Sequence, residues 1–278
     1  MNFSVLISIF DKEKTENYDS CLASLAQQSL KASEIIVVHD GFIGGPLLSI
    51  EEKYKDSLPL HIVPLKVNQG LGKALNEGLR HCSYDIVLRM DTDDVCVRDR
   101  FQKQILFLEC NPNIDICGSS IYEFDKSIDN IYAERKLPTV HKDIVEFAKS
   151  RCPFNHMTVA YRKKVVLQVG GYQDLPHMED YYLWIRVVLS GAQCANLAEP
   201  LVYVRAGEDM IIKRGGWQYV KSELYLINYM LQRRFISLLQ WTKLLIIRIP
   251  IRLMPLIVRK NVYCFIRTKV KNVAKAEV

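Results

Sequence analysis

The sequence predicts an α/β protein built on a largely parallel, doubly wound sheet. Three stretches, residues 3–9, 34–38 and 84–90, have the apolar character and length of strands buried inside such a sheet. Residues 15–29 lie between the first two stretches and repeat apolar side chains at helical spacing. Strands and helices that alternate in this way are typical of a parallel sheet covered by helices.

The composition fits a globular protein with one large domain, alone or with an appendage. Of the 278 residues, 49% are apolar and 24% are charged, so the chain can bury a full core. Its eight cysteines form no C-x-x-C pair, which indicates a reduced, cytosolic protein without a zinc site. Residues 1–10 lack the basic segment and long apolar run of a signal peptide, so they are interpreted as the first strand.

The second predicted strand leads into His39-Asp40-Gly41. An acidic residue at the end of the second strand of a β-α-β unit is well placed to hold a nucleoside by its ribose or base. An Asp-Gly pair also suits an ordinary turn. On these residues alone, both interpretations stay open.

A glycine-containing loop follows a third predicted strand at 60–65 and reads NQGLGKALNEGL. Gly70 and Gly72 allow the backbone to approach a ligand closely, and a helix that begins near Lys73 directs free N–H groups at an anion. The spacing is not that of a Walker A loop, and Leu75 stands where the dinucleotide motif has its third glycine. The alternative is an ordinary turn with a solvated lysine.

Three aspartates, Asp91, Asp93 and Asp94, follow the predicted strand at 84–90, where open α/β sheets bind their ligands. Carboxylates this close repel one another unless a cation binds. Oxygen ligands suit Mg²⁺ or Mn²⁺, which share their coordination shell with substrate phosphates. The alternative is a polar turn in which Asp93 or Asp94 caps a helix predicted at 97–110.

Strands without intervening helices dominate the second half. Residues 114–124 and 128–137 are predicted to be extended, Thr139 to cap a helix that ends near Ser150, and 157–161 to form another strand. This arrangement predicts a region of mixed sheet that shapes the pocket of a second substrate.

A further helix is predicted within 177–191, with Glu179 and Asp180 at its start. These acids either cap the helix and favour its dipole, by about 0.3–1 kcal/mol, or supply a general base for the second substrate. The segment alone favours capping.

The C-terminal segment is basic and apolar. Residues 233–275 hold eleven of the 37 basic residues and no acidic residue, which indicates a separate module. The apolar run at 235–258 is interrupted by charges and prolines, so no stretch approaches the ~20 residues of a spanning helix. Such a segment suits a helix in the membrane interface. A helical appendage packed on the catalytic domain or on a dimer partner is the alternative, and nucleic-acid binding ranks last because no binding motif is present.

One continuous helix in this segment would place four arginines on one face: Arg234, Arg248, Arg252 and Arg259. Pro250 and Pro255 would disturb that phase.

In their order and spacing, these motifs resemble the family 2 glycosyltransferases, which are inverting nucleotide-sugar enzymes with a GT-A fold. The resemblance covers residues 3 to about 205. It rests on FSVLISIF at 3–10, VVHDG at 37–41, NQGLGKALNEGL at 68–79, MDTDD at 90–94 followed by RDRFQKQ, FNHMTVAYRK at 154–163, GGY at 170–172 and EDYYLWIR at 179–186.

The resemblance implies a catalytic domain at 1–210, with a nucleotide-sugar-binding half at 1–110 and an acceptor half at 111–210, and a helical, membrane-associating tail at 211–278.

For the donor side, the resemblance implies that Asp40 contacts the uracil or ribose of a UDP-sugar. Asp91 would touch the nucleotide and, together with Asp93, hold Mn²⁺ or Mg²⁺. Lys73 and Arg100 would be supporting charges near the donor.

For the acceptor side, the resemblance implies that Asp180, paired with Glu179, removes the proton of the attacking hydroxyl. His156 and Trp184 would lie near the acceptor.

One departure from the family pattern concerns the stretch near residue 205. Members often carry Tyr-Arg-x-His there, whereas this chain reads Val204-Arg205-Ala206-Gly207. Arg205, or Arg214 in the loop KRGGW at 213–217, would then serve the diphosphate in place of the histidine.

The expected reaction moves glucose or galactose from a UDP-sugar to an N-acetylhexosamine on undecaprenyl diphosphate, with inversion to a β linkage. The expected setting is O-antigen or exopolysaccharide synthesis, by a peripheral protein on the cytoplasmic face of the inner membrane. The alternatives are a non-catalytic, membrane-bound scaffold with the same fold, and a transferase that acts on a polymer or protein acceptor.

Overall fold

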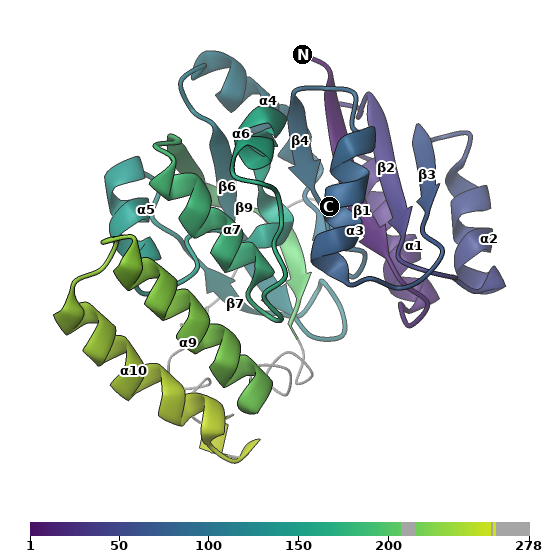
Figure 1. Cartoon of the computed structure of the whole chain (residues 1–278). Coiled ribbons are helices and arrows are strands. Elements are labelled where there is room, and N and C mark those ends of the chain that lie inside the picture. Colours follow the sequence, from purple (N-terminus) through teal and green to yellow (C-terminus); the bar gives the residue numbers. More distant parts are fainter. Residues whose placement is uncertain (207–214, 257, 260–278) are drawn as a thin grey trace.

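The computed structural model describes residues 1–206, 215–256, 258 and 259, and within them a nine-stranded mixed sheet forms the centre (Figure 1). In spatial order its strands are β3 (Leu60–Pro64), β2 (Glu34–His39), β1 (Phe3–Ile9), β4 (Ile86–Arg89), β8 (Ala160–Arg162), β6 (Ile116–Phe124), β9 (Cys194–Arg205) and β5 (Val95–Cys96), while β7 (Ile131–Arg135) pairs with β6. The strands β3, β2, β1 and β4 are parallel, and β8 runs antiparallel to β4 and β6. The predicted α/β class with a mixed sheet is confirmed.

Helices cover both faces of the sheet because its strands are apolar on both sides. One face carries α1 (Thr15–Ala26), α2 (Gly45–Tyr54) and α4 (Arg100–Cys110), and the other carries α3 (Leu71–His81), α6 (Lys163–Gln168) and α7 (Glu179–Leu189). In β1, Val5 and Ile7 join the first core cluster and Leu6 joins the second, as the alternation of side chains along a strand requires.

Two predicted helix starts were wrong. The helix predicted to begin at residue 97 begins at Arg100, because Val95–Cys96 pairs with β9 as a short strand. Thr139 does not cap α5 (His141–Ala148): Val140 occupies the N-cap position without a side-chain hydrogen bond, and the Thr139 carbonyl accepts the Asn196 N–H at 3.2 Å. In both places, pairing with β9 sets the local structure.

The C-terminal segment folds into a hairpin of α9 (Trp217–Gln232) and α10 (Leu238–Leu253), seen in green and yellow in Figure 1. The hairpin shares a hydrophobic cluster with α7, to which α7 contributes Tyr181 and Ile185 and α9 contributes Leu226 and Met230. The described part of the tail therefore packs against the α/β part of the chain through α7. None of the described helices combines the length and apolar character needed to cross a membrane.

The single continuous helix that would place four arginines on one face does not form: α10 begins after Arg234 and ends at Leu253, two residues before Pro255. Arg248 and Arg252 point inward to the fully buried Glu223 of α9, at N–O distances of 2.5 and 2.8 Å. Arg234 lies in the turn between the helices, with a φ of +57°. Burying these charges depends on a partner from another helix, which the tail sequence alone does not reveal.

Candidate active site

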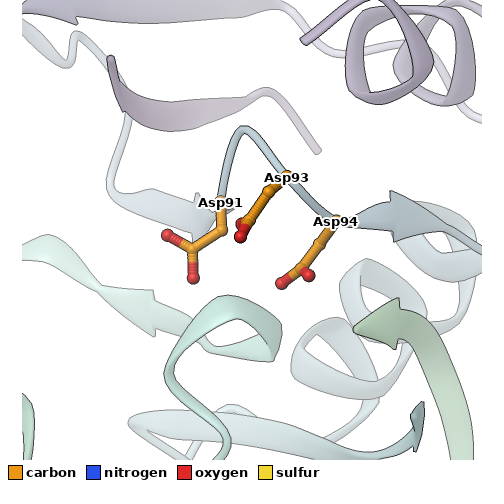
Figure 2. Close-up of side chains that lie close together, drawn as sticks. All are labelled: Asp91, Asp93 and Asp94. Atoms are coloured by element: carbon orange, nitrogen blue, oxygen red, sulfur yellow. The ribbon is translucent and has the colours of Figure 1, made fainter. Parts of the chain in front are cut away.

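The three aspartates lie together in the loop between β4 and β5 (Figure 2). One carboxylate oxygen from each of Asp91, Asp93 and Asp94 lies within 4.8 Å of the others. Asp94 is buried and accepts the Arg205 backbone N–H at 2.9 Å, whereas its Oδ2 has no hydrogen-bond partner among the described residues. The first residue of α4 is Arg100, so neither Asp93 nor Asp94 caps that helix.

The electrostatics of this loop fit a divalent cation. Burial, followed by the charges of Asp91 and Glu13, raises the pKa of Asp93 to about 7. Burial and then the charge of Asp93 raise the pKa of Asp94 well above its usual value. A cation bound among these oxygens would relieve the repulsion and satisfy the orphaned Oδ2 of Asp94, and an all-oxygen set suits Mn²⁺ or Mg²⁺.

Beneath the aspartates lie two buried arginines. Arg89, at the end of β4, forms an ion pair with Asp91. Arg100 is fully buried, and it donates to the Arg89 carbonyl at 2.7 Å and to Gln104 at 3.0 Å. Arg100 was expected to be a supporting charge near the donor, but it is fully buried, and its guanidinium supports the backbone beneath the acidic loop.

An open pocket of about 400 Å³ lies where β1 and β2 end, and its lining residues are Phe10, Asp11, Lys12, Asp40, Gly41, Phe42 and Asn68. Asp40 is thus at the place expected for nucleoside binding. Its carboxylate also accepts the backbone N–H groups of Gln69 and Gly70, at 2.7 and 2.9 Å. Asp40 therefore ties the glycine-containing loop to the end of β2.

That loop brings α3 against α7. A Cβ on Gly72 would lie 3.3 Å from Tyr172 Cβ and 3.7 Å from Glu179 Cβ, so the glycine permits the close approach. Lys73, the next residue, is exposed in the first turn of α3. The first turn of α3 therefore lies next to the first residue of α7.

Glu179 and Asp180 begin α7, but Met178 occupies the N-cap position and no side-chain cap is formed. Burial, and then the charge of Asp180, raises the pKa of Glu179 to about 7. The carboxylate of Asp180 accepts the Tyr181 N–H at 2.7 Å and the Cys152 thiol at 3.8 Å. Two adjacent carboxyl groups in different environments are an arrangement suited to proton transfer.

The two residues expected near the acceptor are buried behind this region. Trp184 is fully buried, with its ring edge-on to Phe154 at 5.4 Å between centroids, because it faces the sheet from the middle of α7. His156 is buried, and its Nε2 lies 2.8 Å from the Tyr172 hydroxyl. Burial and then the charge of Arg89 lower the pKa of His156 well below its usual value. Both side chains support the site from within the core.

The departure near residue 205 has a structural reading. The Arg205 guanidinium lies over the Phe124 ring, 4.7 Å from its centroid, and its Nε is 3.4 Å from the Asp93 carbonyl oxygen. Arg205 therefore braces the acidic loop from β9. Arg214, the other candidate for the diphosphate, lies outside the described residues.

Three residues in contact with the site escaped the sequence reasoning. Glu13 accepts the Thr92 hydroxyl at 2.6 Å, and Cys152 contacts Asp180. Only Arg89 left a signal in the sequence, as the one charge in the apolar run at 86–90.

The mixed α/β fold, with an acidic cluster at the carboxyl end of β4, is shared with a known family of transferases. Residues 4–170 match the model of glycosyl transferase family 2, and the chain belongs to this family. The predicted family is thereby confirmed, and the chain is an enzyme of the glycosyltransferase class.

Two relatives match nearly the whole chain. It is 45% identical to the amylovoran biosynthesis glycosyltransferase AmsE of Erwinia amylovora, over 94% of this chain and 97% of the relative. It is 31% identical to the UDP-Gal:alpha-D-GlcNAc-diphosphoundecaprenol beta-1,3-galactosyltransferase of Escherichia coli, over 94% of each chain.

Solved structures show the same fold. The S. aureus TarS fragment 1–349 in complex with UDP-GlcNAc has a TM-score of 0.62 at 20% identity, over 88% of this chain and 80% of that one. The mannosyltransferase PcManGT of Pyrobaculum calidifontis, in complex with GDP-Man and Mn²⁺, has a TM-score of 0.59 at 14% identity, over 95% and 79%. The expected GT-A fold is confirmed.

Proposed function

We propose that this chain transfers a hexose, glucose or galactose, from a UDP-sugar to an N-acetylhexosamine carried on undecaprenyl diphosphate, during synthesis of a surface polysaccharide. The observation that carries the proposal is that the carboxyl pair at the start of α7 lies close to the acidic cluster, close enough for the charges of Arg89 and Asp91 to act on Glu179. The galactosyltransferase relative, matched over 94% of both chains, supports the donor and the lipid-linked acceptor.

The residues divide the work between two sides. The pocket at Asp40 takes the nucleoside, and the N–H groups at the start of α3 face its phosphates. Asp91 and Asp93 hold Mn²⁺ or Mg²⁺, which when bound neutralises charge on the departing diphosphate. Asp180, fixed by the Tyr181 N–H and the Cys152 thiol, accepts the proton of the acceptor hydroxyl. In-line attack by that hydroxyl inverts the anomeric carbon to a β linkage, without a covalent enzyme intermediate.

Release of UDP by the purified chain tests the proposal. UDP-glucose, UDP-galactose and their N-acetyl forms are each supplied with Mn²⁺ or excess EDTA and with a synthetic lipid-diphosphate acceptor bearing GlcNAc or GalNAc. We expect turnover with one hexose donor, dependent on both acceptor and metal. Turnover only with a polymer or protein acceptor would replace the lipid acceptor, and no turnover by folded protein with any acceptor would favour a scaffold.

We also propose that α10 rests on the cytoplasmic surface of the inner membrane. Leu239, Ile246 and Leu253 recur every seven residues, so they share one face of the helix, and they are 79%, 74% and 49% exposed. Lys243 is exposed between them, and Arg233 is exposed in the turn that precedes the helix. Exposed apolar side chains with flanking cations suit the interface of an anionic leaflet, at about 1 kcal/mol for each cation near the surface.

Co-sedimentation with anionic vesicles tests this placement. A double substitution, Leu239→Ser with Ile246→Ser, should release the protein from phosphatidylglycerol vesicles without lowering its melting temperature. The matched control is Leu106→Ser on α4, which is 56% exposed on another helix and should leave binding unchanged. Unchanged binding by the double variant would contradict the membrane-facing role of α10.

A further inference from the structure

Arg89 is a buried cation that the proposed reaction does not use. Its side chain is 1% exposed, at the end of a strand between β1 and β8. Removing a guanidinium from water costs several kcal/mol unless an opposite charge compensates. A buried arginine in the middle of the sheet therefore requires a specific partner.

The partner is Asp91, and the strand itself fixes the pair. Residues two apart along an extended chain point to the same side, so Arg89 and Asp91 meet while Met90 points into the core on the opposite side. Nη1 of Arg89 forms the ion pair with Oδ1 of Asp91. Nε of Arg89 has no hydrogen-bond partner among the described residues.

The backbone of Arg89 is held on both sides. Its N–H donates to the Val159 carbonyl at 2.9 Å, and its carbonyl accepts from Arg100 at 2.7 Å. Asp93, by contrast, lies on a turn. Asp94 is tied to β9 through the Arg205 N–H. Of the two proposed cation ligands, Asp91 and Asp93, Asp91 is thus the one whose carboxylate is tied to the sheet.

We propose that Arg89 is a positioning residue, which holds the Asp91 carboxylate in place for the cation before the nucleotide-sugar binds. This inference rests on the proposed cation site. Arg89 also offsets one of three negative charges whose oxygens lie within 4.8 Å of one another. The cluster can therefore stay assembled without a metal ion.

Removing Arg89 has two opposing effects on the affinity for a cation. Loss of a nearby positive charge strengthens the attraction, whereas loss of the fixed position of Asp91 weakens it. Outer partners that orient a metal ligand typically contribute 10- to 100-fold to metal affinity. Once a cation displaces the protons of Asp93 and Asp94, two negative charges remain in excess with Arg89 present, so attraction is already strong and orientation decides the outcome.

The test is Mn²⁺ binding to the full chain, measured by the loss of the free-ion electron paramagnetic resonance signal. Arg89→Gln should bind Mn²⁺ about 10- to 100-fold more weakly than wild type. The matched control, Arg252→Gln, also removes a buried arginine from a carboxylate, that of Glu223, but in the C-terminal hairpin. It should lower the melting temperature and leave Mn²⁺ affinity unchanged.

Unchanged or tighter Mn²⁺ binding by Arg89→Gln, or an equal loss in Arg252→Gln, would overturn the role of Arg89. If Arg89→Gln does not fold, Arg89→Lys decides, because lysine keeps the charge without the planar fork of arginine. It should bind Mn²⁺ several-fold more weakly, and wild-type affinity would overturn the proposal.

A further variant, Asp93→Asn, separates this inference from the cation site itself. If the wild-type chain and Arg89→Gln bind Mn²⁺ equally and Asp93→Asn does not bind it, only the role of Arg89 is overturned. No Mn²⁺ binding by the wild-type chain overturns both.

Discussion

The acidic loop should make the metal-free protein less stable as the pH rises. Burial, with the charges of Asp91 and Glu13, raises the pKa of Asp93 from 3.8 to about 7. Below pH 3.8 the carboxyl is protonated in the folded and unfolded chains alike. As the pH rises towards 7, the unfolded chain loses this proton while the folded chain retains it, so the free energy of unfolding falls. Above that pH both states are ionised and the loss is complete.

The size of this effect follows from the shift. One pKa unit corresponds to about 1.4 kcal/mol, so the raised pKa of Asp93 lowers the free energy of unfolding by at most about 4 kcal/mol. Asp93 is partly exposed, so solvent screening brings the expected value down to about 2 kcal/mol. Asp93→Asn removes the charge, and in EDTA its gain in stability over wild type should grow from nothing at pH 4 to about 2 kcal/mol at pH 8.

Urea unfolding in EDTA at intervals from pH 4 to pH 8 measures this difference, and the exposed Asp56→Asn serves as the control. Saturating Mn²⁺ should stabilise the wild-type protein most at high pH, because the cation replaces the proton. A stability difference between Asp93→Asn and wild type that does not change with pH would refute the reasoning.

Three other predictions concern the base, the hairpin and the glycine loop. Asp180→Asn should lower kcat by about 10²- to 10⁴-fold with Mn²⁺ affinity unchanged; near-normal turnover would remove Asp180 as the base. Glu223→Gln should lower the free energy of unfolding by about 3–5 kcal/mol, because it leaves the buried Arg252 and the half-buried Arg248 without a counter-charge. The control is the exposed ion pair of Glu52 and Lys55: Glu52→Gln should lower the free energy of unfolding by at most about 1 kcal/mol in the same urea titration. Equal losses of stability in the two variants would contradict the buried network. Gly41→Ala should raise the KM for the UDP-sugar, because Gly41 has a φ of +88° and an added Cβ would lie 2.7 Å from the Asn68 backbone nitrogen. An unchanged KM would show that this turn does not shape the donor pocket.

The strands and the acidic loop could be predicted from the sequence because their causes are local. Apolar runs the length of a buried strand formed β1, β2 and β4, and the carboxyl end of β4 gathered the aspartates at one edge of the sheet. Any chain that buries such runs in parallel order must bring their following loops together.

Side chains whose position depends on a distant partner could not be predicted in this way. Trp184 and Arg100 lie inside motifs that resemble a functional site, yet each points into the core. Arg248 points inward because it pairs with Glu223 on a different helix. The spacing of residues along α10 does not predict that contact. The helical repeat predicts which residues of a helix share a face, but it does not predict which face packs against a neighbouring helix.

The placement of α7 argues against treating the catalytic domain and the tail as separate functional parts. Its first turn carries Glu179 and Asp180 and lies against the loop of Gly72, on the donor side. The following residues, among them Tyr181, pack against the hairpin, and the Arg248 guanidinium lies 5.8 Å from the Tyr181 ring. The helix that presents the proposed base is therefore held between the start of α3 and the hairpin, whose α10 is proposed to rest on the membrane. Removing the hairpin would expose the buried face of α7 and loosen the turn that carries Asp180, so the tail contributes to the active site even though it supplies none of the candidate catalytic groups.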